Sequence, residues 1–135
     1  MLRKLLLVDD DYDECHLFER ILLDIDPAIA CYYACNGKDA VEKLESKDIQ
    51  IPEICFVDIN MPFMNGWAFI DYLQQHPQYQ SVSIIVYSTS SQAADIQKAK
   101  ELGVSYFIKP NVLDELKHKL ETLYSSPLPL HLDNQ

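Results

Sequence analysis

The chain has 135 residues, 48% of them apolar, and carries a formal net charge of −10 at pH 7. This length fits one domain that can bury roughly two-thirds of its unfolded surface, and the apolar content excludes a disordered protein. The acidic charge disfavours binding to nucleic acid, whose phosphates would repel the chain.

Apolar runs and helical stripes alternate along the chain. Leu5–Val8 is a continuous apolar run, typical of a strand buried on both faces of a parallel sheet. Apolar residues at helical spacing follow, until Pro27 closes the first helix. The same two patterns predict strands at 5–8, 28–34, 54–57, 83–87 and 106–108, and helices over 18–25, 40–44, 67–75, 93–99 and 113–123.

Several predicted helices carry end signals. Asp11 is expected to begin the first helix, and Gly103 is placed to terminate the fourth, whose apolar face is thin. Asn111 can cap the last helix, with Asp114 three residues further on.

Five strand–helix pairs in succession predict an α/β fold with a parallel sheet, helices on both of its faces and right-handed crossovers. After Tyr124 the chain has two prolines and no periodicity. We therefore expect one domain over residues 1–125 and a flexible C-terminal tail over 126–135. In such a fold the ligand site lies beyond the carboxyl ends of the strands, where the strand order reverses.

The cysteine pattern and the N-terminal residues favour a location in the cytoplasm. The four cysteines show no CxxC spacing, and Cys31 and Cys35 are expected to be small buried hydrophobes on one face of a strand. The apolar run near the N-terminus is too short for a signal peptide, and no stretch approaches the roughly 18 apolar residues of a membrane span. We expect a reduced, cytoplasmic protein that does not enter a membrane.

Polar side chains follow four of the five predicted strands. They are Asp9-Asp10-Asp11, Asp58, Ser88-Thr89-Ser90-Ser91 and Lys109-Pro110. Each group alone could be a helix cap or a turn, but their coincidence at four strand ends favours one shared pocket.

The predicted pocket is suited to a phosphoryl group. Two carboxylates about 4 Å apart repel by on the order of 4 kcal/mol at an effective dielectric of about 20, so a carboxylate cluster either raises a pKa or recruits a cation. Mg²⁺ suits such oxygen ligands. Lys109 adds a positive charge and Ser88 a hydroxyl donor, so that a carboxylate could attack phosphorus beside them.

The motifs LLLVDD, FVDINMPFMNGW, IIVYS and YFIKP, in this order, resemble a two-component response-regulator receiver domain of the chemotaxis type. The resemblance extends from about Lys4 to Tyr124. It implies a (βα)5 doubly wound, flavodoxin-like sheet with the strand order 2-1-3-4-5.

The resemblance also implies the acceptor and the metal ligands. Asp58 matches the aspartate that accepts the phosphoryl group. Asp10 matches a direct Mg²⁺ ligand, while Asp9 acts largely through water. Asp58 itself and the backbone carbonyl of Asn60 complete the ligand set.

Three further positions match the residues that respond to phosphorylation. Lys109 matches the lysine that pairs with the phosphoryl group. Ser88 matches the switch hydroxyl, and Tyr106 matches the aromatic side chain that turns inward when that hydroxyl moves.

The implied function is phosphoryl transfer from a sensor histidine kinase or a histidine phosphotransfer protein to Asp58, which switches a surface that docks a downstream protein. No DNA-binding or catalytic domain follows the last predicted helix, so docking is the expected output. Self-phosphorylation and autodephosphorylation would be the only catalytic activities of the protein. Whether phosphorylation produces a homodimer is left open by the sequence.

Three alternatives remain. Asp9-x-Asp11 resembles the nucleophile loop of haloacid-dehalogenase-type phosphatases, which would make Asp9 the nucleophile. A flavodoxin-like cofactor binder is disfavoured by the three negative charges after the first strand. A receiver-like scaffold that is never phosphorylated is the third alternative.

Overall fold

The fold is taken from a computed structural model, which describes residues 4–61, 63–110 and 112–125, apart from the side chain of Tyr124. Strands and helices alternate as predicted. The elements are β1 (Lys4–Val8), α1 (Tyr12–Ile25), β2 (Ala30–Ala34), α2 (Gly37–Glu45), β3 (Ile54–Val57), α3 (Gly66–Gln75), a 3-10 turn η1 (Pro77–Tyr79), β4 (Ser83–Ser88), α4 (Ala93–Leu102), β5 (Ser105–Ile108) and α5 (Leu113–Tyr124). The predicted tail over 126–135 lies outside the described residues.

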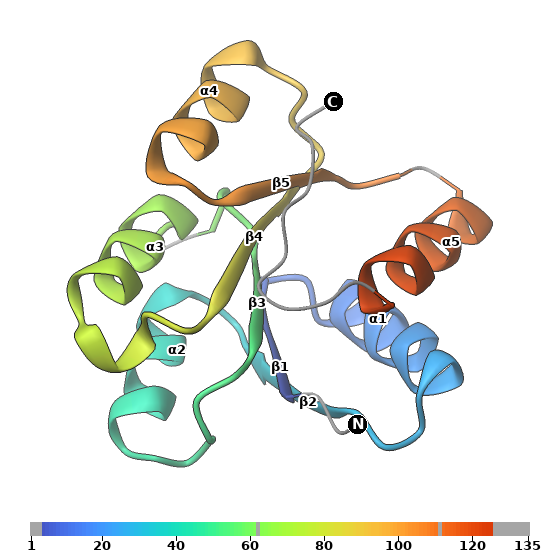
Figure 1. The fold of residues 1–135 in the computed structure, drawn as a ribbon, viewed down its shortest axis with the longest axis horizontal. Coiled ribbons are helices and arrows are strands. Elements are labelled where there is room, and N and C mark those ends of the chain that lie inside the picture. The colour runs from blue at the N-terminus through green and yellow to red at the C-terminus, as the bar shows by residue number, and fades with distance from the viewer. Residues whose placement is uncertain (1–3, 62, 111, 126–135) are drawn as a thin grey trace.

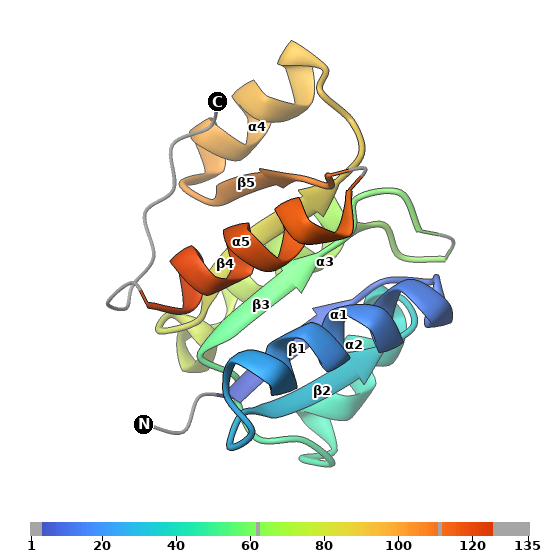
Figure 2. The same cartoon turned by 90° about the vertical axis from the view of Figure 1, so that its right-hand side faces the viewer.

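The five strands form one parallel sheet in the order β2-β1-β3-β4-β5. The predicted fold class and strand order are therefore confirmed. Helices α1 and α5 cover one face of the sheet, and α2, α3 and α4 cover the other (Figure 1). The strand arrows point toward one common edge (Figure 2). The strand order reverses between β1 and β3, so the site is expected there.

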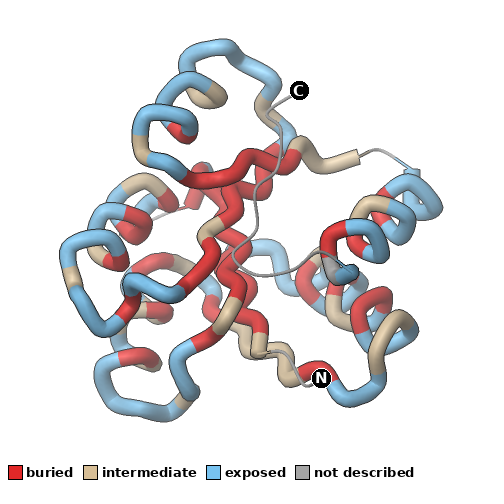
Figure 3. Tube along the Cα trace, in the orientation of Figure 1, coloured by how far each residue is buried: buried red, intermediate tan, exposed pale blue. Residues whose placement is uncertain are grey.

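Side-chain alternation along the strands divides the core into two layers. Leu6 and Val8 of β1 pack into the layer under α2–α4, while Leu5 and Leu7 pack into the layer under α1 and α5. Because both faces of the sheet are covered, the central strands need apolar side chains at every position. The buried residues accordingly concentrate along the sheet (Figure 3).

Polar residues begin and end several helices as the sequence predicts. The Asp11 side chain caps α1 by accepting a hydrogen bond from the Glu14 N–H at 3.1 Å. Gly103 ends α4 in the left-handed conformation, with φ 73°. Among the residues of α4, all of them described, Ala99 alone is buried, which confirms its thin apolar face.

Helix α5 begins at Leu113, as predicted. The residue that precedes α5 is Val112, and among the described residues no side chain caps this helix. Asn111, the predicted cap, lies outside the described residues. Asp114 and Glu115 in the first turn instead place negative charge beside the exposed N–H groups of the helix, where the helix dipole favours it.

One prediction about the cysteines is wrong. Cys35 is exposed, because β2 ends at Ala34 and Cys35 already belongs to the following loop. Cys31 lies on the edge strand and is half-buried, while Cys15 and Cys55 are buried. Within the part of the chain that the structure describes, no helix has both the length and the apolar character needed to cross a bilayer.

Candidate functional site

Three carboxylates meet at the carboxyl end of the central strands. Val8 of β1 and Val57 of β3 are neighbours in the sheet, so the residues after them, Asp9 and Asp58, emerge side by side. One oxygen each of Asp9, Asp10 and Asp58 lies within 4.8 Å of the others. Asp9 and Asp58 are buried and Asp10 is exposed, so the cluster opens to solvent on the side of Asp10.

Backbone N–H groups hold the two buried carboxylates in place. Asp9 Oδ1 accepts a hydrogen bond from the Asp11 N–H, and Asp58 Oδ1 accepts one from the Asn60 N–H, each at 3.0 Å. Both carboxylates present their Oδ2 atoms to Lys109. Burial raises the pKa of Asp58, while the Asn60 N–H and the charge of Lys109 act in the opposite direction.

Lys109 is surrounded by three carboxylates. Its Nζ lies 2.6 Å from Glu14 Oε1, 3.3 Å from Asp9 Oδ2 and 3.6 Å from Asp58 Oδ2. Burial lowers the pKa of Lys109, but the close contact with Glu14 and the charges of Asp9 and Asp58 outweigh burial and raise the pKa well above its usual range. The ammonium group is therefore a permanent positive charge at the site.

The predicted switch residues are connected through Ser90. Ser88 is buried, and its Oγ accepts a hydrogen bond from the Ser90 N–H at 3.1 Å. The hydroxyl of the buried Tyr106 donates to the Ser90 carbonyl at 2.8 Å. The Ser90 hydroxyl in turn donates to Asp95 of α4 at 2.7 Å. Ser90 thus links β4, β5 and α4, a role that the strand-end pattern did not indicate.

Comparison with known families shows which family the chain belongs to. The model of the response regulator receiver domain matches residues 5–121. The chain belongs to the response regulator receiver domains. Its place in two-component signalling follows from this membership.

Two related proteins illustrate the range of the family. A chemotaxis protein CheY homolog from Campylobacter jejuni is 30% identical over 121 residues, which cover 87% of this chain and 89% of that protein. The protein-glutamate methylesterase/protein-glutamine glutaminase 2 of Carboxydothermus hydrogenoformans is 36% identical over 117 residues, or 84% of this chain. The matched region is only 31% of that second protein's length.

Solved response regulators share the fold. The phosphorylated cyanobacterial phytochrome response regulator RcpA superposes with a TM-score of 0.85 and 21% identity, over 96% of this receiver domain and 100% of that chain. The Mn²⁺-bound form of response regulator Rcp1 superposes with a TM-score of 0.82 and 21% identity, over 95% and 99% of the two chains. At these identities the likeness supports the fold alone.

Glu14 is a site residue of this receiver domain that the sequence did not reveal. It is the third residue after the cap Asp11, where a glutamate commonly returns to the N–H of the capping residue. The Asp11 N–H is instead bound by Asp9, and the Glu14 carboxylate contacts Lys109. The strand-end pattern missed Glu14 because this residue lies on a helix.

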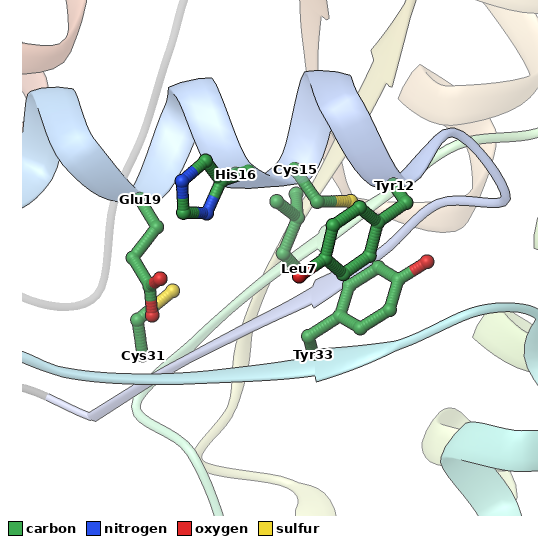
Figure 4. Close-up of a pocket in the computed structure, with 7 residues that line it drawn as sticks. All are labelled: Leu7, Tyr12, Cys15, His16, Glu19, Cys31 and Tyr33. Carbon is green, nitrogen blue, oxygen red and sulfur yellow. The ribbon is translucent and has the colours of Figure 1, made fainter.

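The receiver domain also has a pocket of about 210 Å³ between α1 and β2 (Figure 4). Tyr12 stands edge-on to Tyr33 there, with ring centroids 6.1 Å apart. Burial raises the pKa of Cys15 and raises that of Cys31 to about 12. Both thiols are therefore protonated at neutral pH, which makes them poor nucleophiles and poor metal ligands.

Proposed function

We propose that Asp58 accepts a phosphoryl group from a phosphohistidine of a sensor histidine kinase or a histidine phosphotransfer protein. The observation that carries the proposal is the position of Asp58 Oδ2, 3.6 Å from the Lys109 ammonium, within a cluster that also contains Asp9 and Asp10. A carboxylate can attack phosphorus as a nucleophile, and the product is a negatively charged acyl phosphate. The permanent cation beside it stabilises that negative charge.

In the transfer step, an Asp58 oxygen attacks phosphorus while the bond between phosphorus and the histidine nitrogen of the donor breaks. The imidazole leaves with the electron pair of that bond and then takes a proton from solvent. Lys109 pairs with the phosphoryl oxygens, as expected when charge develops on a transferring phosphoryl group. The Asn60 N–H, which donates to Asp58 Oδ1, keeps the carboxylate oriented during the attack.

The carboxylate cluster fits Mg²⁺. Asp9, Asp10 and Asp58 supply the oxygen ligands that this ion prefers, and the Asn60 carbonyl completes the set that we propose. When bound, Mg²⁺ supplies a second positive charge beside the phosphoryl oxygens. The carboxylate cluster and Glu14 together place four carboxylates around one lysine, a surplus of negative charge that a divalent cation would relieve.

The response to phosphorylation passes through Ser88. Its hydroxyl reorients to donate to the phosphoryl group, which changes the hydrogen bond that its Oγ accepts from the Ser90 N–H. Ser90 is hydrogen-bonded to both Tyr106 and Asp95, so a movement of Ser90 is transmitted to β5 and α4. Because few buried contacts hold α4, that helix is the element whose docking surface responds.

Exposed apolar side chains near the carboxyl ends of the strands suit the docking of a phosphohistidine donor. Phe63 in the loop after β3 is 90% exposed, and Tyr12 at the start of α1 is 66% exposed. Val112 and Leu113, at the start of α5, are also exposed. Tyr12 and Phe63 follow β1 and β3, as the carboxylate cluster does, while Val112 and Leu113 follow β5, the strand that Lys109 also follows. A donor that covers these side chains would bring its histidine to Asp58.

Phosphorylation by acetyl phosphate in Mg²⁺ tests the proposal. The wild type should gain the mass of one phosphoryl group, Asp58→Asn should gain none, and Asp24→Asn, at the exposed far end of α1, should match the wild type. No mass gain in the wild type would contradict the proposal. Sustained turnover of a phosphate ester that Asp9→Asn abolishes and Asp58→Asn does not would establish the phosphatase alternative instead.

Transfer from a histidine kinase tests the docking surface separately. Phe63→Ala should slow transfer from the phosphorylated kinase while leaving the reaction with acetyl phosphate unchanged, because the small donor needs no protein contact. An equal loss with both donors would show that Phe63 supports the site itself rather than the kinase.

A further inference from the structure

We propose that Glu14 is a positioning residue that holds Lys109 away from Asp58 in the unphosphorylated protein, and so limits the rate at which Asp58 is phosphorylated. This inference rests on the proposed function, since it concerns the control of the same site.

The three contacts of Lys109 are unequal. Its Nζ lies 1.0 Å closer to Glu14 Oε1 than to Asp58 Oδ2, at 2.6 Å against 3.6 Å. The contact with Glu14 is a close ion pair, and the contact with Asp58 is a much longer one. The ammonium group is therefore drawn toward α1 and away from the acceptor.

The sequence around Glu14 explains why its side chain is available to Lys109. The N–H of the capping residue Asp11 donates to Asp9 Oδ1, so the usual partner of a glutamate at this helix position is occupied. The Glu14 backbone is fixed by its own N–H, which donates to the Asp11 side chain. The Glu14 carboxylate, with a side-chain exposure of 33%, faces a lysine side chain that is only 11% exposed.

Glu14 has two opposing effects on the site. Its negative charge adds to that of the carboxylate cluster and so favours Mg²⁺ binding. During transfer, however, the phosphoryl group must compete with Glu14 for Lys109, and a negatively charged donor must approach one more carboxylate. Loss of Glu14 therefore weakens Mg²⁺ binding and accelerates transfer at saturating Mg²⁺, a combination that general loosening of the fold would not produce.

The test compares Glu14→Gln, Glu14→Asp and the matched control Asp13→Asn with the wild type. Asp13 lies in the same first turn of α1 and is exposed, so Asp13→Asn removes the same charge from the same turn without touching the Lys109 contact. The Mg²⁺ Kd is measured by isothermal titration calorimetry. The rate constant with acetyl phosphate is measured at saturating Mg²⁺ by mass spectrometry, and thermal melts confirm that each variant folds.

Glu14→Gln should raise both the Mg²⁺ Kd and the saturating rate constant by about two- to fivefold, the size expected for one partly exposed ion pair. Glu14→Asp keeps the charge but shortens the reach, so it should accelerate transfer while leaving the Kd near that of the wild type. Asp13→Asn should leave the rate constant unchanged.

The outcomes separate this inference from the proposed function. A phosphorylated wild type with equal rate constants for wild type and Glu14→Gln would overturn the inference and leave the acceptor role of Asp58 intact. If the wild type takes up no phosphoryl group, the proposed function fails. In that case the Mg²⁺ titrations still test whether the Glu14 contact with Lys109 matters. An equal rise in the Mg²⁺ Kd for Glu14→Gln and Asp13→Asn would refute a specific role of that contact.

Discussion

The hydroxyl of Tyr106 donates a hydrogen bond of 2.8 Å to the backbone carbonyl of Ser90. This bond joins β5 to the segment between β4 and α4. The same Ser90 donates its hydroxyl to Asp95, the third residue of α4. The start of α4 is therefore tied to the strand that carries Lys109 at its end.

Tyr106→Phe should loosen α4 without removing the acceptor. The substitution keeps the buried ring and deletes the hydroxyl, which should lower the free energy of unfolding by about 1 kcal/mol. Amide hydrogen exchange in α4 should become faster, while acetyl phosphate should still phosphorylate Asp58. Tyr12→Phe, at an exposed position, is the control. Unchanged exchange in α4 of Tyr106→Phe would show that the bond to Ser90 does not restrain this helix.

Gly66→Ala should damage both stability and phosphorylation. A Cβ at this position would meet the backbone of Asp58, and would stand 2.7 Å from the Cα of Ile59. The backbone cannot yield without moving the acceptor, so we expect a loss of about 3 kcal/mol, at the upper end of overpacking effects, together with slower phosphorylation. Urea unfolding and the acetyl phosphate assay measure the two effects.

Gly103→Ala provides the contrast to Gly66→Ala. Gly103 has φ 73°, and a Cβ there would meet nothing within 4 Å. Backbone strain in Gly103→Ala should lower the free energy of unfolding by about 1 kcal/mol, and the phosphorylation rate should not change. If Gly66→Ala behaved like Gly103→Ala in both assays, the close approach of α3 to Asp58 would have no functional consequence.

Removal of Mg²⁺ should reveal the repulsion within the carboxylate cluster. At about ten times its Kd, Mg²⁺ should stabilise the wild type by about 1.4 kcal/mol, and a chelator should reverse this gain. Asp10→Asn should lose most of the gain. Without Mg²⁺ the variant should be at least as stable as the wild type, because one of three like charges is gone. Urea unfolding with and without Mg²⁺ measures both effects, and full Mg²⁺ stabilisation of Asp10→Asn would exclude Asp10 as a ligand.

Asp39 should make stability depend on pH. Burial acts to raise the pKa of Asp39, but the N–H of Cys35, at 3.0 Å, and the ammonium group of Lys43, at 3.2 Å, outweigh it and lower the pKa below 3.8. The folded state therefore favours the charged carboxylate. Its contribution is fully present above the pKa of the unfolded chain and is lost as the pH falls through the lower pKa of the folded state.

Asp39→Asn should consequently cost about 0.5 kcal/mol at neutral pH, a modest amount because the pair with Lys43 is partly exposed and screened. The difference from the wild type should shrink as the pH is lowered below 3.8. Denaturant unfolding at several pH values measures it, with the exposed Asp48→Asn as control. A difference that stayed constant with pH would mean that the Asp39 charge plays no part.

Where the sequence failed to predict the structure, a local pattern met a constraint from elsewhere in the chain. Cys35 was expected to share a buried strand face with Cys31, but the strand stops one residue earlier, at Ala34. Glu14 occupies a helix position where a local hydrogen bond is usual, and its contact is with Lys109 instead.

The order of the elements and the chemical groups at the strand ends could be predicted from the sequence alone. A parallel sheet covered on both faces requires continuous apolar runs, and each run stops where polar residues begin, as Val57 and Asp58 illustrate. The strand order also followed, through the resemblance to receiver domains.

Which charged groups meet, and at what distance, became clear from the three-dimensional fold. Lys109 and Asp9 are 100 positions apart in the chain, yet their side chains lie 3.3 Å apart, and Lys109 contacts Glu14 more closely than it contacts Asp9 or Asp58. The energy of an ion pair depends on a separation of a few ångströms between side chains from different elements. The periodicity of one segment predicts its secondary structure but not such distances. The place of Asp58 at a strand end could therefore be predicted from the sequence, whereas the contact between Glu14 and Lys109 could not.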